Sequence, residues 1–128
     1  MRPHTKDPVV LLIEEDETIR ESLSDMLTER GYAAVSVRTP AGGMILLERG
    51  FRPRVIVIDP FTPNGAAAFK ERLAADPALN GTPVVLGPRG NSTERQIRRT
   101  LPREHHLPAP LDVHELLKVV HGYCRPWG

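Results

Sequence analysis

The sequence lacks several features that would fix its class at once. It contains one cysteine, Cys124, so no disulfide can form within the chain. The apolar stretch after the polar N-terminus runs only from Val9 to Ile13, which is too short for a signal-peptide core or for the roughly 20 residues of a membrane span. A formal net charge of +1 gives no bulk attraction to nucleic acid or membranes. These absences favour a cytoplasmic protein without a membrane or nucleic-acid partner.

The composition is that of one globular domain. The chain has 128 residues, of which 40% are hydrophobic and 26% are charged. Its 13 prolines fall at the edges of periodic segments, where they separate structural elements. We therefore expect a single domain over residues 1–128, without linker, repeat or low-complexity tract.

Strand and helix patterns alternate along the chain. Apolar segments predict strands at residues 9–13, 32–37, 55–58, 83–86 and, with the least support, 105–107. Helical spacing predicts helices at residues 18–30, 40–49, 66–75 and 91–101, and a last helix after residue 112. Short runs that are apolar throughout are typical of strands buried on both faces of a parallel sheet. The pattern therefore predicts a doubly wound α/β domain with five parallel strands, five helices and right-handed crossovers.

Individual residues refine the helices. The first helix is expected to bury Ile19, Leu23, Met26 and Leu27. The last helix is expected to begin after the cap Asp112 and to bury Val113, Leu116, Leu117 and Val120. Gly31 is placed to end the first helix, whereas Gly42 and Gly43 weaken the second.

Acidic residues follow two of the predicted strands. Glu14, Glu15 and Asp16 come directly after the first strand, and Asp59 comes directly after the third. With a strand order of 2-1-3-4-5, these two strand ends are neighbours at the point where the order reverses, and functional groups gather there. Carboxylates so placed repel one another unless a cation lies between them, and Mg²⁺ prefers such oxygen ligands. The alternative is that these acids are solvated loop residues.

The same residues carry a resemblance to a known family. Residues 10–20, with acids after the first strand, resemble the start of a response-regulator receiver domain of two-component signalling. Residues 53–63 resemble the receiver segment that carries the phospho-accepting aspartate, with Pro63 four residues after Asp59. The similarity spans about residues 8–123 and implies the flavodoxin-like receiver fold with strand order 2-1-3-4-5.

The resemblance implies a role for each acid. Asp59 would accept a phosphoryl group from a sensor histidine kinase. Glu15 and Asp59 would bind Mg²⁺ directly, together with the backbone carbonyl of Phe61, and Glu14 would act through water. A metal that withdraws charge from the carboxylate and the phosphoryl oxygens is what makes an aspartate reactive toward phosphorus.

The sequence departs from the family pattern at several positions. The hydroxyl residue that ends the fourth strand of receivers is replaced by Gly87 or Pro88, and the lysine after the fifth strand is replaced by Ala109. His106 occupies the position of an aromatic switch residue. The acid pair is two glutamates, each one methylene longer than aspartate, so Mg²⁺ is expected to bind weakly or not at all. Arg89 could supply a cation, but a solvated surface arginine is the better interpretation.

These departures indicate a degenerate receiver. A modification shifts a conformational equilibrium only if its contacts differ between the two conformers. Without the hydroxyl and the lysine, a phosphoryl group would make few such contacts. We therefore predict a non-enzymatic protein-interaction module with weak or phosphorylation-independent signalling. The alternative is a working phosphorelay receiver or phosphate sink that uses Asp59. A flavodoxin-like enzyme is disfavoured, because the first strand is followed by acids instead of a glycine-rich phosphate loop.

Partners are suggested by basic residues near the fourth helix. Arg95 and Arg99 share one helix face, on the surface of the fourth helix, fifth strand and fifth helix that receivers commonly use for docking. Either they bind a protein partner, such as a kinase or a downstream signalling protein, or they are simply solvated; a homodimer is also left open. No nucleic-acid-binding motif is present. The adjacent His105 and His106 should point to opposite faces of the fifth strand, and surface histidines are expected rather than a metal site.

Overall fold

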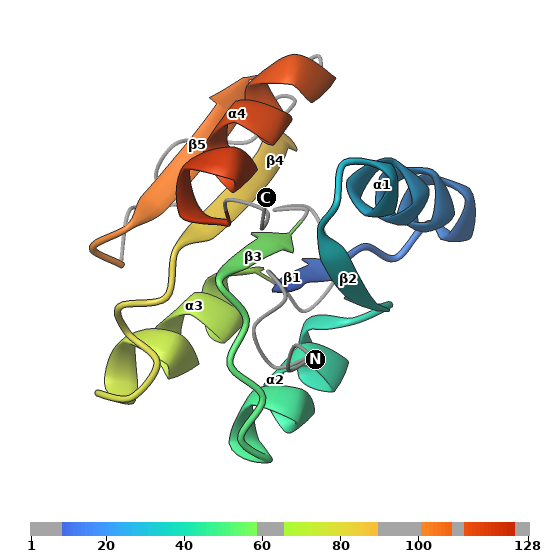
Figure 1. Ribbon diagram of the computed structural model, residues 1–128. Coiled ribbons are helices and arrows are strands. Elements are labelled where there is room, and N and C mark those ends of the chain that lie inside the picture. The colour runs from blue at the N-terminus through green and yellow to red at the C-terminus, as the bar shows by residue number, and fades with distance from the viewer. Residues whose placement is uncertain (1–8, 59–65, 90–100, 109–111, 125–128) are drawn as a thin grey trace, which may run out of the picture.

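The protein is a five-stranded parallel sheet covered by helices on both faces (Figure 1). A computed structural model describes residues 9–58, 66–89, 101–108 and 112–124. The strands are β1 (Val9–Ile13), β2 (Ala33–Val37), β3 (Val55–Ile58), β4 (Val84–Arg89) and β5 (Glu104–Pro108). The helices are α1 (Glu17–Glu29), α2 (Pro40–Glu48), α3 (Ala66–Ala75) and α4 (Val113–Tyr123). The strand order is β2-β1-β3-β4-β5, as the sequence predicted.

The alternation of side chains along each strand divides the core into two layers. Leu11 and Ile13 of β1 face α2 and α3, whereas Val10 and Leu12 face α1 and α4. All four side chains are at most 1% exposed. Because both faces of the central strands are covered, the strands need apolar residues at every position, and this explains the unbroken apolar runs in the sequence.

Helix ends follow the local sequence signals. Asp16, Thr39 and Asp112 are N-caps whose side chains accept hydrogen bonds from backbone N–H groups in the first turns of α1, α2 and α4. Gly31 follows α1 with a φ of 92°, a left-handed conformation that glycine adopts without strain. The predicted cap at Asp112 and the predicted glycine after α1 are therefore confirmed.

Two residues predicted to be buried are exposed, so that prediction was wrong for them. Ile19 is 46% exposed and Val113 is 37% exposed, whereas Leu27, Leu116, Leu117 and Val120 are buried. Both exposed residues lie in the first turn of their helices. Helical periodicity predicts which face is apolar, but not how far along the axis that face is covered.

Gly43 proves to be a packing position. It is buried, and a Cβ added there would lie 2.8 Å from Cδ1 of Ile13. The glycine that weakens α2 as an isolated helix therefore allows α2 to approach β1 closely.

The remaining boundaries differ only slightly from the prediction. The weakly supported fifth strand is present and spans Glu104–Pro108, and β4 continues beyond residue 86 with a register irregularity between Leu86 and Arg89. Four of the five predicted helices fall within the described residues, and most of the predicted helix at 91–101 lies outside them. None of the helices described is long and apolar enough to cross a bilayer.

Candidate functional site

The carboxyl ends of the strands meet at one edge of the sheet. Ile13 of β1 pairs with Ile58 of β3, which pairs with Leu86 of β4, and Leu86 pairs in turn with His106 of β5. The chain therefore leaves β1 at Glu14 beside the point where it leaves β3, immediately before Asp59. The strand neighbours on which the predicted site depends are confirmed.

The acids after β1 have three different environments. Glu14 is 9% exposed, and its Oε2 accepts a hydrogen bond from the backbone N–H of Asp16 at 3.0 Å. Asp16 caps α1 by accepting from the N–H of Ile19 at 2.9 Å. Glu15 is exposed. Glu15 and Asp16 are thus both open to solvent, and of these two Asp16 is engaged in capping α1.

Arg20 stiffens the turn that holds these acids. Its Nη1 donates to the backbone carbonyl of Glu14 at 2.9 Å and to that of Glu15 at 3.3 Å. The N–H of Glu14 also donates to the carbonyl of Val37 at 3.1 Å, which continues the β1–β2 pairing by one residue. The guanidinium therefore satisfies backbone carbonyls at the start of α1. Neither this role of Arg20 nor the capping role of Asp16 was predicted from the sequence.

The complete metal set is not contained in the described residues. Asp59 and Phe61 lie outside them, as does Ala109, so the approach of Glu15 to Asp59 stays a prediction. Gly87 and Pro88 belong to β4, at the strand end beside β3. Within residues 9–58, 66–89, 101–108 and 112–124, no three His, Cys, Asp or Glu side chains are grouped closely enough to hold a metal ion. Arg95 and Arg99 also lie outside the described residues.

His106 contacts a buried ion pair that the sequence did not predict. Glu104, at the start of β5, accepts at Oε2 from the ammonium of Lys70 at 2.6 Å and contacts Nε2 of His106 at 2.5 Å. Its Oε1 accepts from the backbone N–H of Leu101 at 3.1 Å. The Lys70 and Glu104 side chains are 2% and 0% exposed. The cluster Lys70–Glu104–His106 therefore joins α3 to β5 in the interior.

The register shows where this cluster lies relative to the predicted site. Glu104 pairs with Val84, two rows before the pair of Leu86 and His106. Successive residues of a strand advance by about 3.3 Å, so the Glu104 backbone lies about 7 Å short of the His106 row. A lysine at the centre of α3, flanked by Phe69 and Leu73, gave no signal in the sequence, because its partner is 34 positions away.

His105 points to the opposite face of β5. Its Nε2 is 2.7 Å from the hydroxyl of Tyr123 on α4, and the two rings are in edge contact with centroids 5.4 Å apart. The prediction that His105 and His106 face opposite ways is therefore confirmed. Both histidines are partly buried, and each is hydrogen-bonded to a side chain.

Cys124 ends α4 with a fully buried thiol. Burial raises the pKa of this thiol from 9.0 to about 11, against a smaller lowering effect of Arg54. The thiolate is the reactive form of cysteine, so such a group is inert at neutral pH.

Comparison with known proteins identifies the fold. No family model matches the sequence, and no curated protein is significantly similar to it. Solved structures do match over most of the chain. A receiver domain of a histidine kinase from Syntrophus aciditrophicus superposes with a TM-score of 0.80 at 24% identity, covering 91% of this chain and 89% of that one.

Further receiver structures give the same result. The receiver domain of a Francisella response regulator has a TM-score of 0.76 at 23% identity, with 91% of this chain and 96% of that chain covered. The receiver domain of a sensor histidine kinase from Pseudomonas aeruginosa PAO1 has a TM-score of 0.77 at 17% identity, with 91% and 97% covered. That structure has a magnesium ion coordinated in its active site cleft. The chain therefore has the receiver fold.

Proposed function

We propose that this protein is a signal-transduction module that acts by binding other proteins, with weak or phosphorylation-independent switching. One observation carries the proposal. The receiver fold brings the acidic end of β1 beside the segment leading to Asp59, whereas the neighbouring end of β4 has Gly87 and Pro88 in place of a hydroxyl residue. The sequence keeps Asp59 as the proposed phosphoryl acceptor but lacks the hydroxyl and ammonium groups that would contact a phosphoryl group on it.

The chemistry of the missing groups explains the proposed weakness. A hydroxyl at the end of β4 would bond a phosphoryl oxygen in one conformer only, and a lysine after β5 would neutralise its charge. Neither glycine, proline nor alanine can do so, and a modification without a differential contact shifts no equilibrium. Glu14 is also engaged with the backbone of Asp16, and this leaves Glu15 as the readier metal ligand at the end of β1.

Mg²⁺ is the metal that these residues suit, since carboxylate and carbonyl oxygens are its usual ligands. Glu15, Asp59 and the carbonyl of Phe61 would hold it, with Glu14 acting through water. The ion would draw charge from the carboxylate of Asp59 and from an incoming phosphoryl group. We propose weak binding, because the longer glutamate side chains are less closely defined in position than the octahedral geometry of Mg²⁺ demands.

The second candidate function is that of a phosphorelay receiver or phosphate sink. It is favoured by the acidic edge itself, since an exposed Glu15 beside β3 supplies the negative charge that a metal-assisted acceptor needs. Two of the similar structures come from histidine kinases, so a kinase is a reasonable phosphoryl donor or docking partner.

One experiment separates the two functions. The protein is incubated with Mg²⁺ and acetyl phosphate or phosphoramidate, and phosphorylation is measured by intact mass, with Asp59→Asn as the control. We expect little adduct and no change in circular dichroism or fluorescence in the wild type. A stable adduct that requires Asp59, accompanied by a large spectral change, would establish the phosphorelay function and overturn our proposal.

A matched variant tests the physical reason. Gly87→Thr combined with Ala109→Lys supplies the hydroxyl and the ammonium that receivers use. We expect this double variant to accumulate more adduct on Asp59 than the wild type does, by about tenfold or more if the lysine and hydroxyl each contribute charge-assisted contacts. Equal adduct in both proteins would show that the missing groups are not what limits phosphorylation.

A further inference from the structure

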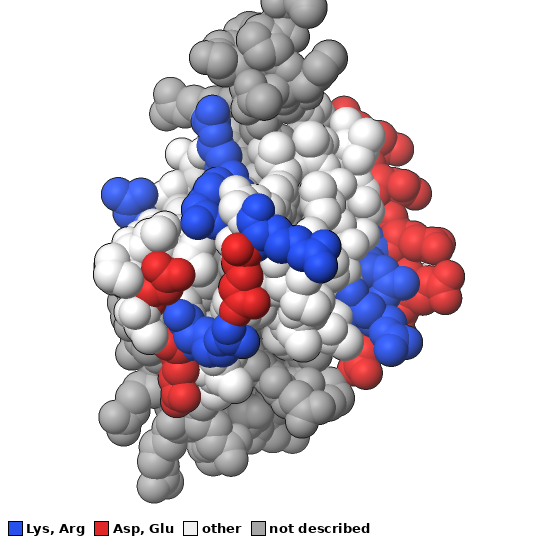
Figure 2. Space-filling view, turned by 90° about the horizontal axis from the view of Figure 1, so that it is seen from below, with Lys and Arg blue, Asp and Glu red and all other residues white. Residues whose placement is uncertain are grey.

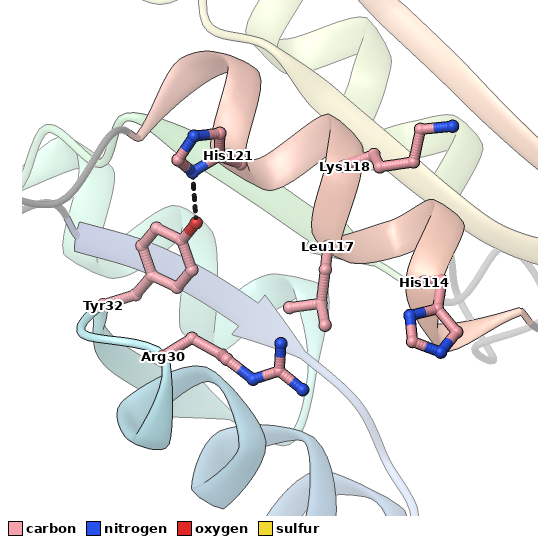
Figure 3. Close-up of a pocket in the computed structure, with 6 residues that line it drawn as sticks. All are labelled: Arg30, Tyr32, His114, Leu117, Lys118 and His121. Atoms are coloured by element: carbon pink, nitrogen blue, oxygen red, sulfur yellow. Dashed lines mark hydrogen bonds between the residues drawn. The ribbon is translucent and has the colours of Figure 1, made fainter.

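A groove lies between the end of α1 and the helix α4 (Figure 3). Its volume is about 610 Å³. The lining consists of two permanent cations, two imidazoles, a phenol and an aliphatic side chain: Arg30, Lys118, His114, His121, Tyr32 and Leu117. None of these side chains is acidic, so the groove is positively charged, and we call it the basic groove.

The floor of the basic groove is apolar and held in place. Leu117 is 9% exposed and Tyr32 is 5% exposed, and both belong to the core layer beneath α1 and α4. The Tyr32 hydroxyl is 3.0 Å from Nδ1 of His121, and it donates to that nitrogen when Nδ1 carries no proton (Figure 3). Burial, with a smaller contribution from Cys124 and against an opposing effect of Arg30, raises the pKa of this hydroxyl. It therefore stays protonated at neutral pH and can fix the imidazole at this end of the groove.

The cations at the rim of the groove are exposed to solvent. Arg30 extends from the end of α1 toward Leu117, and His114 lies on the other side of Leu117 (Figure 3). Lys118 extends outward from α4 and has a 3.6 Å ion pair with Glu115, but both side chains are at least half exposed. Such a pair contributes little to stability and can exchange partners. The positive charge at the rim is therefore open to an anion from solution.

The face of the sheet that α2 and α3 cover is different. Figure 2 is seen from that side and shows basic and acidic side chains next to one another. Arg72 of α3, for example, forms an ion pair with Glu48 of α2. A smaller groove there, of about 190 Å³, is lined by Arg72 and by apolar side chains. The collected positive charge of the basic groove is thus a local feature of a chain whose formal net charge is only +1.

The lining suits a phosphate group attached to a planar ring. A phosphate monoester carries a charge of about −1.5 to −2 at neutral pH, which two permanent cations can balance. The guanidinium of Arg30 can bind two phosphate oxygens at once, and a planar ring can cover the apolar floor. The volume of about 610 Å³ also lies in the usual range of small-ligand pockets, roughly 300–1,000 Å³. A protein partner usually covers about 20–30 residues on each side, far more than line this groove.

We propose that the basic groove binds a nucleoside monophosphate, with its phosphate between Arg30 and His114 and its base against Tyr32. Leu117 lies beneath the nucleotide, and Lys118 adds a second positive charge at the rim. The charge of the phosphate is met by groups from two helices, and the ring covers apolar surface that is otherwise in water.

This binding site goes beyond the proposed signalling function. It lies between α1 and α4 and includes neither Asp59 nor Glu15, so the failure of one function leaves the other untouched. It would give the module a ligand that acts without phosphorylation.

Calorimetric titration of the whole chain with adenosine monophosphate, without Mg²⁺, tests the site. We expect binding in the micromolar to submillimolar range. Arg30→Gln should weaken it about tenfold or more, because a charge-assisted contact is lost, and Lys118→Gln by about threefold, because that charge acts from the exposed rim. Arg49→Gln, at an exposed position at the end of α2 on the opposite face, should leave the affinity unchanged.

Parts of the nucleotide test the two halves of the groove. Adenosine lacks the phosphate and inorganic phosphate lacks the ring, and each should bind at least about tenfold more weakly than adenosine monophosphate. Equal affinity for inorganic phosphate and the nucleotide would show that the floor takes no part, and would overturn the proposal. So would no binding at millimolar nucleotide, or an Arg30→Gln variant that binds as the wild type does. A glutamate-rich peptide that binds more tightly than the nucleotide, with the same dependence on Arg30, would assign the groove to a protein partner instead.

Discussion

Two carboxylates near strand ends, Glu104 and Glu15, have opposite surroundings. Glu104 has a fully buried side chain bound by Lys70, His106 and the N–H of Leu101. Glu15, two residues beyond the end of β1, is exposed. A buried charge must be paired and hydrogen-bonded, because its desolvation otherwise costs several kcal/mol, whereas an exposed one keeps its hydration.

The difference between Glu104 and Glu15 is one between a structural carboxylate and a solvent-exposed one. Both oxygens of Glu104 are hydrogen-bonded to neighbours in the interior, including Lys70 of α3. Binding a ligand there would require these buried hydrogen bonds to break. Glu15 can lose water to a metal ion at much smaller cost. The cluster at β5 is therefore part of the protein interior, whereas Glu15 after β1 stays exposed to solvent.

Substitution of Lys70 is expected to change the stability of the protein most. Lys70→Met leaves the Glu104 carboxylate buried without its ammonium partner, and we expect the free energy of unfolding to fall by about 3–5 kcal/mol. Glu15→Gln removes an exposed charge and should change it by less than about 0.5 kcal/mol. Urea denaturation followed by circular dichroism measures both. A loss near that of Glu15→Gln would show that Lys70 and Glu104 do not form the pair that the structure places there.

The double variant sharpens that prediction. Lys70→Met with Glu104→Gln removes both charges, so its loss should be smaller than the sum of the two single losses. Additive losses would instead mean that each side chain is stabilised by other neighbours.

Two helical glycines differ in the same way, because one is tightly packed and the other has open space around it. Gly43→Ala places a methyl group against Ile13 and should destabilise the protein by about 1–3 kcal/mol, although alanine is the better helix former. Gly122→Ala, in α4, meets no atom within 4 Å and should stabilise it by about 0.5–1 kcal/mol. Thermal unfolding compares the two; a stabilising Gly43→Ala would show that α2 can move away from β1 at little cost.

The buried thiol of Cys124 gives the smallest effect, which appears only at alkaline pH. Its folded pKa of about 11 lies above the unfolded value of 9.0, so the unfolded chain loses this proton first as the pH rises. The stabilising contribution of the neutral thiol is present below pH 9 and is lost as the pH rises toward 11. Stability measured against pH should therefore fall more steeply in the wild type than in Cys124→Val. Parallel curves would mean that the thiol is not desolvated.

Much of the fold could be predicted because its signals are local. The all-apolar runs at Val9–Ile13 and Val55–Ile58 define strands covered on both faces, and Thr39 and Asp112 define helix starts by their own hydrogen bonds. The expectation that the acids after β1 lie beside the end of β3 followed from the strand order that receivers share. The pairing of Ile13 with Ile58 confirms that neighbourhood.

Other features could not be predicted, because they depend on residues far apart in the sequence. The partner of Lys70 lies 34 positions away, and that of Tyr32 lies 89 positions away. The exposure of Ile19 and Val113 was also missed, because helical periodicity does not show how much of an apolar face is covered.

The sequence by itself determined the order of elements, the helix caps and the identity of the groups at the sheet edge, because each depends on a residue and its near neighbours. The tertiary structure alone decided which charges are buried and paired, and it brought Tyr32, which follows α1, into hydrogen-bonding contact with His121 of α4. Burial and electrostatic environment arise only when distant segments exclude water from one another, so a glutamate carboxylate is buried and paired at Glu104 but exposed to solvent at Glu15.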